Sequence, residues 1–270
     1  MKEPTELVTD DVLTAAHRAR FRSVLGPGGI DSPLIAWTLA LPVATDLAVD
    51  GTEKLDALVG APPLPLRMQA GSECTFGAPI PVGASVRRRS ALDGVRRHRG
   101  RSGADLVLVT IAHEVTADDR LALTERQTIV YRQPGPAGRG GERPGTPTWT
   151  TTRTASVTEL FTYSALTFNA YRIHYDRDFC TAAGYPGLVV HGPLLATWLL
   201  DAAARHADGP VRSFAYRALA PVFVDQPVRL CGRPAEQGWQ CWVEHLDGRV
   251  AVSATIGIGA ARGPLDRVGQ

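Results

Sequence analysis

The stretch from Gly192 to Pro210, GPLLATWLLDAAARHADGP, predicts the strongest helix in the chain. Its apolar side chains recur at helical spacing and form one continuous stripe: Leu194, Leu195, Trp198, Leu199, Ala202 and Ala203. Pro193 suits the first helical position, because the N–H that proline lacks would have no partner there. Gly209 and Pro210 end the helix. A helix with such a stripe needs a covering layer, which the neighbouring segments are expected to supply.

The segments after this helix predict an antiparallel sheet. Strands are expected at 211–220, 227–233, 238–246 and 249–258. The last two are joined through Asp247 and Gly248, a strong two-residue hairpin signal. Alternation of side-chain character along residues 238–246 is typical of a strand. The second half of the chain is therefore predicted to be a long apolar helix wrapped by a sheet.

The first half repeats this order more loosely. A helical stretch at 32–49, interrupted by Pro42, precedes four strands expected at about 64–76, 84–95, 104–115 and 120–132. Between the halves, residues 133–152 are rich in glycine and proline and predict a linker. We therefore predict an α+β protein with an N-terminal domain at 1–132 and a C-terminal domain at 153–270.

The composition of the 270-residue chain points to a globular protein in a reducing compartment. Its net charge of +2 gives no reason to expect a nucleic-acid or membrane partner. The four cysteines form no C-x-x-C pair, so neither a disulfide framework nor a metal site is predicted. The N-terminus has no apolar signal region, and we expect a cytoplasmic location. The basic stretch at 87–101 is either a solvated strand and turn or a contact for phosphates of a substrate.

The stretch NAYRIHYD, from Asn169 to Asp176, holds the first candidate site residues. It follows a predicted helix that opens at Ser156 with Glu159 three residues later, a capping-box pattern. A histidine alone in such a loop is usually a surface or core residue. Here, however, the amide of Asn169 can hold a water while the neutral imidazole of His174 takes its proton. A group that holds the water and a base that takes its proton are the least that the addition of water to a polarised double bond requires.

The stretch GYPGLVVHGPLL supplies a second candidate feature at the start of the long helix. Gly192 lets a ligand approach the backbone closely, and the unpaired N–H groups of a helix N-terminus stabilise developing negative charge. The alternative is that Gly192 and Pro193 only cap a core helix and that His191 packs. Nucleophile-elbow, phosphate-loop, zinc-protease and dinucleotide motifs do not occur. Candidate substrate-binding residues are Tyr171, Arg172, Val190, His191 and Pro193.

Several stretches resemble one known family. They are FTYSALTFNAYRIHYD, GYPGLVVHGPLLATWLLD, GRSGADLVLVTIAHEV, LTERQTIVYR and PLRMQAGSECTFGAPIPVG. The sequence is similar to MaoC-like hydratases and dehydratases, in particular the branch of type 2 hydroxyacyl-thioester dehydratases and mesaconyl-CoA and itaconyl-CoA hydratases. The likeness extends from about residue 60 to residue 230.

This resemblance implies a double hot-dog fold and reversible hydration of a trans-2-enoyl thioester to the (R)-3-hydroxyacyl thioester. The family's hydratase motif, D-x-N-P-x-H, places its acid at Asn169 and its histidine at His174. An amide cannot take a proton, which leaves His174 as the base and Asn169 as the residue that holds the water. The backbone N–H of Gly192 would polarise the thioester carbonyl. Tyr171 stands where the branch often has histidine.

The substrate implied is an acyl-CoA or an acyl carrier protein thioester, with coenzyme A or phosphopantetheine as the handle and no other cofactor. The first half holds no His/Asn pair of this kind, so we expect a degenerate hot dog whose groove accepts the acyl chain. An exposed sheet edge favours a homodimer. Two other functions stay open: a thioesterase on the same fold, and a non-catalytic subunit that binds acyl thioesters.

Overall fold

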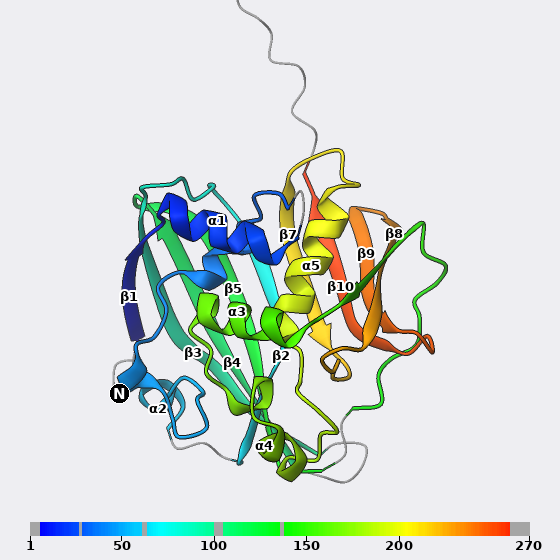
Figure 1. Ribbon diagram of the computed structural model, residues 1–270. Coiled ribbons are helices and arrows are strands. Elements are labelled where there is room, and N and C mark those ends of the chain that lie inside the picture. The colour runs from blue at the N-terminus through cyan, green and yellow to red at the C-terminus, as the bar shows by residue number, and fades with distance from the viewer. Residues whose placement is uncertain (1–5, 27–28, 61–63, 100–104, 136–137, 260–270) are drawn as a thin grey trace, which may run out of the picture.

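A single antiparallel sheet of ten strands forms the frame of the protein (Figure 1). The computed structural model describes residues 6–26, 29–60, 64–99, 105–135 and 138–259. The strand order is β1-β3-β4-β5-β2-β7-β10-β9-β8-β6. The strands are β1 (Glu6–Val12), β2 (Leu66–Phe76), β3 (Ser85–Arg99), β4 (Asp105–Ala117), β5 (Arg120–Arg132), β6 (Trp149–Thr154), β7 (Val211–Ala218), β8 (Pro227–Ala235), β9 (Gly238–His245) and β10 (Val250–Ile258).

The helices gather on one face of this sheet, where α5 and α3 lie in front of the central strands (Figure 1). The α-helices are α1 (Ala15–Val24), α2 (Asp56–Val59), α3 (Val157–Thr167), α4 (Arg177–Ala182) and α5 (Gly192–Ala204). Three short 3-10 helices complete the set: η1 (Pro33–Thr38), η2 (Ala44–Asp46) and η3 (Arg172–His174).

The two halves of the chain each contribute five neighbouring strands. Pairing between β2 and β7 joins them into one sheet. This arrangement is the predicted double hot dog, and every strand predicted from the sequence is present. The strands at the two edges of the sheet, β1 and β6, were not predicted.

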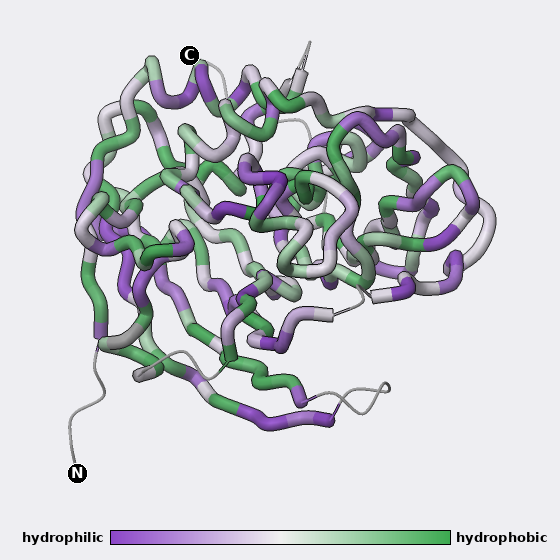
Figure 2. The backbone as a smooth tube through the Cα atoms, turned by 60° about the horizontal axis from the view of Figure 1, so that its bottom comes forward, coloured by the Kyte–Doolittle hydropathy of each residue, from purple (hydrophilic) through white to green (hydrophobic). Residues whose placement is uncertain are grey.

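Helix α5 forms the centre of the core, as its apolar stripe predicted. Leu194, Trp198 and Leu199 are at most 1% exposed, and burying each such side chain contributes about 1.5–3 kcal/mol. The strands face this core with alternate residues, so hydrophobic and hydrophilic segments follow one another along the tube (Figure 2). In β4 the inward set is Val107, Val109, Ile111, His113, Val115 and Ala117.

The prediction of a helix at 32–49 was wrong. The stretch forms only η1 and η2, with Ala40 between them at a φ of 53°. Pro42 explains the break, because a residue that precedes proline is disfavoured in the helical region. A helix of the first half lies earlier, at α1, which packs against α3 and η1. The first half therefore has no counterpart of α5 in its predicted place.

The linker predicted at 133–152 was wrong in its last residues, because Trp149–Thr154 forms strand β6, which pairs with β8. Tryptophan and threonine favour such extended pairing. The preceding part lies along the second half of the sheet: Gly141 exchanges backbone hydrogen bonds of 2.9 Å with Val250. Arg143 donates two hydrogen bonds of 2.8 Å to the buried carboxylate of Glu244. The described part of this segment therefore packs along the second half of the sheet and is not a free linker.

Across the described residues, no helix combines the length and the apolar character needed to cross a membrane. The same residues hold no cluster of three or more His, Cys, Asp or Glu side chains arranged for a metal ion.

Candidate active site

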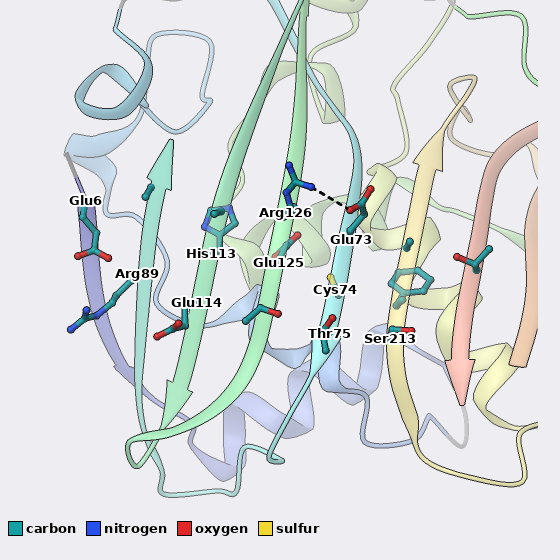
Figure 3. Close-up of a pocket in the computed structure, with 16 residues that line it drawn as sticks. Glu6, Glu73, Cys74, Thr75, Arg89, His113, Glu114, Glu125, Arg126 and Ser213 are labelled. Atoms are coloured by element: carbon teal, nitrogen blue, oxygen red, sulfur yellow. Dashed lines mark ion pairs between the residues drawn. The ribbon is translucent and has the colours of Figure 1, made fainter. Parts of the chain in front are cut away.

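Two hollows in the structure differ in character, and only one contains the predicted site residues. The larger, of about 680 Å³, is a solvent-facing depression on the outer face of the sheet (Figure 3). Exposed charged side chains contribute to its lining, and two of them, Arg126 and Glu73, lie 3.9 Å apart. No residue predicted for the chemistry reaches it.

The second hollow is a cavity of about 310 Å³ on the helical side, with lining from both halves of the chain. That volume lies at the small end of ligand pockets. Six of the predicted site residues line it: Asn169, Tyr171, His174, Val190, Gly192 and Pro193. Arg172 and His191 do not. The fold therefore brings together the two stretches that carried the sequence prediction.

Local structure explains how Asn169 and His174 reach the cavity. Ser156 and Glu159 form the predicted capping box at the start of α3. The helix ends at Phe168, whose φ of 49° turns the chain out of the helix. Asn169 then accepts a hydrogen bond through Oδ1 from the N–H of Tyr171 at 3.0 Å, which leaves its amide NH₂ group for a ligand. The next turn, η3, delivers His174.

A loop of the first half supports this segment from below. The carbonyl of Asp50 accepts a hydrogen bond of 3.0 Å from the N–H of Arg172. Gly51, at a φ of 84°, backs directly onto the carbonyl of Ala170, where any Cβ would collide. This contact could not be predicted from local sequence patterns, since residues 50 and 51 lie about 120 positions before their partners. The segment that carries Asn169 and His174 is thus positioned by both halves.

His174 has the burial and the hydrogen bonding that a general base needs. Its side chain is 7% exposed, and Nδ1–H donates to the carbonyl of Val189 at 2.7 Å. This bond selects the tautomer in which Nε2 carries the lone pair. Within the described residues Nε2 has no hydrogen-bond partner. Burial lowers the pKa of His174 to about 4, so the imidazole is neutral and available to a water at ordinary pH.

His191 lies behind His174 rather than in the cavity, which corrects its prediction as a substrate-binding residue. The two imidazole rings stack with 3.5 Å between centroids and 18° between planes. Nε2 of His191 lies 2.9 Å from the hydroxyl of Ser164, while Nδ1 has no partner among the described residues. Burial and the neighbouring His174 lower the pKa of His191 well below its usual value. His191 therefore packs as a neutral ring that supports the plane of His174.

The N-terminus of α5 faces the same cavity. Gly192 is the first residue of the helix, and its N–H has no partner within the helix. No side chain caps this end, and an added Cβ on Gly192 would meet only the carbonyl of Gln69, at 3.8 Å. The backbone N–H at Gly192 is thus open to an oxygen that gains negative charge.

Arg172, a second predicted substrate contact, is directed elsewhere. Its guanidinium donates to Asp176 at 2.9 and 2.7 Å and lies 4.7 Å from the ring centre of Phe179. The spacing of four residues favours this pairing over a contact with a ligand. Tyr171 does line the cavity. Its ring stands at 88° to that of His174, with 6.1 Å between the centroids, and burial raises the pKa of its phenol.

Sequence reasoning missed a polar group from the first half that lines the same cavity: Arg88, His113, Glu125 and Gln127. A signal did exist. His113 occupies an inward position of β4 among valine and isoleucine residues, and Glu125 lies opposite it on β5. Polar residues in an inward row of a strand need a reason, because burial of an unpaired polar group is costly.

Comparison with known proteins identifies the family of the chain. The family model for hydroxyacyl-thioester dehydratase type 2 matches residues 35–224. The chain is 38% identical, over 94% of its length and 95% of the relative, to a mesaconyl-C(4)-CoA hydratase of Chloroflexus aurantiacus. Among solved structures, HtdX of Mycobacterium tuberculosis matches with a TM-score of 0.69 at 19% identity, over 94% of this chain and all of the other.

A second Mycobacterium tuberculosis structure, described as a double hotdog fold, matches with a TM-score of 0.61 at 15% identity over 96% of both chains. At such identities the structures bear on the fold alone, and they confirm the predicted double hot dog. The family match and the Chloroflexus relative confirm an enzyme of the hydro-lyase class. The chain belongs to the hydroxyacyl-thioester dehydratase type 2 family, a branch of the MaoC-like hydratases and dehydratases.

Proposed function

We propose that this enzyme reversibly adds water to a trans-2-enoyl thioester and forms the (R)-3-hydroxyacyl thioester. One observation carries the proposal: a free imidazole nitrogen and an amide line one cavity together with the open N-terminus of α5. A base, a water-holding group and an oxyanion site are the three elements that the reaction needs.

In the proposed mechanism, the NH₂ group of Asn169 holds the water beside the double bond. Nε2 of His174 takes a proton from the water as its oxygen attacks the β-carbon. Electrons move toward the thioester carbonyl, and the N–H of Gly192 stabilises the enolate oxygen. The proton on His174 then passes to the α-carbon, which completes the hydration. The reverse sequence removes water from the 3-hydroxyacyl thioester.

The handle of the substrate is proposed to be coenzyme A or the phosphopantetheine arm of an acyl carrier protein. The name of the Chloroflexus relative supports a coenzyme A thioester. The proposed chemistry needs no cofactor, because acid–base and electrostatic contributions come from His174, Asn169 and the N–H of Gly192. Tyr171, Val190 and Pro193 are proposed to contact the substrate, since each lines the cavity.

A spectrophotometric assay with a panel of enoyl thioesters tests the proposal. Hydration removes the enoyl absorbance and releases no thiol, and this is the expected result. Release of free thiol would instead identify a thioesterase and contradict the proposal. A protein that binds the thioesters without changing either signal would be the non-catalytic subunit.

The homodimer and the cytoplasmic location stay predictions. The two edge strands β1 and β6 each offer an unpaired row of backbone groups within the described chain, which is the basis for a sheet-edge contact between copies. Size-exclusion chromatography with light scattering measures the mass directly, and a monomeric mass would contradict the dimer.

A further inference from the structure

The backbone between Asn169 and His174 is fixed at both ends by the second half of the chain. At one end, the N–H of Asn169 donates to the carbonyl of Ser164 in α3 at 2.9 Å. At the other end, Nδ1–H of His174 donates to the carbonyl of Val189 at 2.7 Å. The residues in between, 170–172, lie instead against a loop of the first half.

Two consecutive residues of that loop contact the middle of the segment. The carbonyl of Asp50 accepts a hydrogen bond of 3.0 Å from the N–H of Arg172. Gly51 lies directly against the carbonyl group of Ala170, an approach that only a residue without a Cβ allows. Both contacts fall between the amide and the imidazole of the site. A shift at either contact would therefore move one of these two groups relative to the other.

The loop, residues 46–54, is closed on itself and tied to the sheet. Oδ1 of Asp50 accepts hydrogen bonds from the N–H of Thr52 at 3.0 Å and from its hydroxyl at 2.7 Å. Arg67 on β2 donates to the carbonyl of Glu53 at 2.6 Å. These bonds hold the turn that presents Asp50 and its neighbour to the segment. The loop thus connects the sheet of the first half with the backbone between the two site residues.

We infer that Gly51 is a positioning residue, which acts through Ala170 to set the place of Asn169 relative to His174. The inference rests on the proposed function, because it concerns how the amide and the imidazole reach the same water. Gly51 acts through the backbone of Ala170 and not through the reacting atoms. A misplacement of about 1 Å can lower a rate by about 10²-fold. The first half thereby contributes to the reaction, although it holds no His/Asn pair of its own.

A matched pair of glycines allows a direct test. Gly51 and Gly83 have φ values of 84° and 92°, so an alanine at either position meets a similar backbone strain. A Cβ on Gly83 meets no atom of the described residues within 4 Å, whereas a Cβ on Gly51 collides with the carbonyl of Ala170. Comparison of Gly51→Ala with Gly83→Ala therefore separates displacement of Ala170 from strain in the backbone.

The first measurement compares rate with binding. We expect Gly51→Ala to lower kcat for enoyl thioester hydration by about 10²-fold, whereas Gly83→Ala keeps nearly the wild-type rate. Calorimetric titration with butyryl-CoA, a saturated and unreactive thioester, should give nearly unchanged affinity for both variants. A folded Gly51→Ala variant with the wild-type kcat overturns the inference. Equal falls in kcat in the two variants, or a loss of butyryl-CoA binding together with the rate, also overturn it.

A second measurement needs no turnover. NMR of isotope-labelled histidine gives the ring-nitrogen shifts of His174, assigned by their absence from His174→Ala. Gly51→Ala should change these shifts, because the bond to Val189 and the stacking on His191 depend on where the ring lies, and Gly83→Ala should leave them unchanged. Unchanged shifts in Gly51→Ala overturn the inference. A wild-type protein that hydrates no enoyl thioester would contradict the proposed function, and the NMR comparison would still decide the positioning.

Asp50 supplies a further test should Gly51→Ala fail to fold. Asp50→Ala removes the acceptor that holds Thr52 and places no new atom against Ala170, so kcat should fall by about 10-fold, the worth of one hydrogen bond. Asp50→Asn keeps an acceptor and should restore most of the rate. A wild-type rate in Asp50→Ala, or equal losses in the two variants, overturns positioning by this loop and with it the role of Gly51.

Discussion

The two halves of the molecule share one sheet but differ in what they place on its inner face. The second half carries the capped helix α3 and the long helix α5, which bring His174 and Gly192 to the cavity. The first half has η1 and η2 in the corresponding stretch of sequence, and its strands supply Arg88, His113 and Glu125.

Two histidines that line the cavity, one from each half of the chain, show this difference. Burial lowers the pKa of His113 and of His174 to about 4 in each case. His113 uses both ring nitrogens, toward Ser90 at 2.8 Å and Gln127 at 3.3 Å. His174 uses only Nδ1. A perturbed pKa therefore does not identify a base by itself, and a free nitrogen in the cavity is the decisive feature.

The largest expected effect separates these two histidines. His174→Ala should lower kcat for enoyl thioester hydration by about 10²-fold or more, the usual scale for a general acid–base residue. His113→Ala, the matched control, should lower kcat far less, because its ring nitrogens are occupied by protein groups. Steady-state kinetics of both variants, with circular dichroism to confirm folding, checks this. An equal fall in kcat in the two variants would contradict the proposal that only the histidine of the second half acts as the base.

A smaller effect is expected at Asn169. Asn169→Ala removes the NH₂ group that we propose to hold the water, and kcat should fall by about 10-fold, the worth of one hydrogen bond. Asn169→Asp keeps the acceptor for the N–H of Tyr171 at 3.0 Å and should retain more activity than the alanine variant. Parallel measurements of kcat decide the point. An alanine variant as fast as the wild type would remove Asn169 from the mechanism.

His191 should give a weaker effect still, through His174. His191→Ala removes the ring that stacks on His174 at 3.5 Å, and we expect a fall in kcat of a few-fold with KM unchanged, because His191 does not line the cavity. His191→Phe keeps a flat ring and should restore most of the rate. A rise in KM with kcat unaltered would instead support the substrate-binding role first predicted from the sequence.

The mildest test is the pH dependence of hydration. Since the pKa of His174 is lowered to about 4, its lone pair is available above that pH, and kcat/KM should fall to about half near pH 4. A midpoint near the usual histidine value of about 6.5 would contradict the buried environment. Circular dichroism at each pH must accompany the rates. The folded protein lowers the pKa of His113, His174 and His191, so the unfolded state binds more protons below about pH 6.5. The free energy of unfolding therefore declines as pH falls from about 6.5 toward 4.

Much of this architecture could be predicted from the sequence, because local patterns decide it. The stripe from Leu194 to Ala203 predicted α5, and the Ser156–Glu159 box predicted the start of α3. The strands followed from alternation and turn residues. The helix at 32–49 failed because the composition suggested a helix where Pro42 prevents one.

The candidate site, like the fold, could be predicted from the sequence only where short local motifs determine it. Asn169, His174 and Gly192 lie in short motifs, and the structure brings them to one cavity. Their surroundings depend on contacts between distant residues, such as Gly51 against Ala170 and His191 against His174. Arg172 looked like a substrate contact, but the nearby carboxylate of Asp176 takes its guanidinium. Such partnerships depend on the folded geometry, which spacing along the chain does not determine.

The central claim is that the second half adds water to the β-carbon of an enoyl thioester through His174. Mass spectrometry of the product formed in oxygen-labelled water tests it most directly. The account predicts one labelled oxygen in the 3-hydroxyl group of an intact thioester, and formation of this product at least about 10²-fold more slowly by His174→Ala. Label in a free carboxylate, or an unchanged yield from the variant, would contradict it.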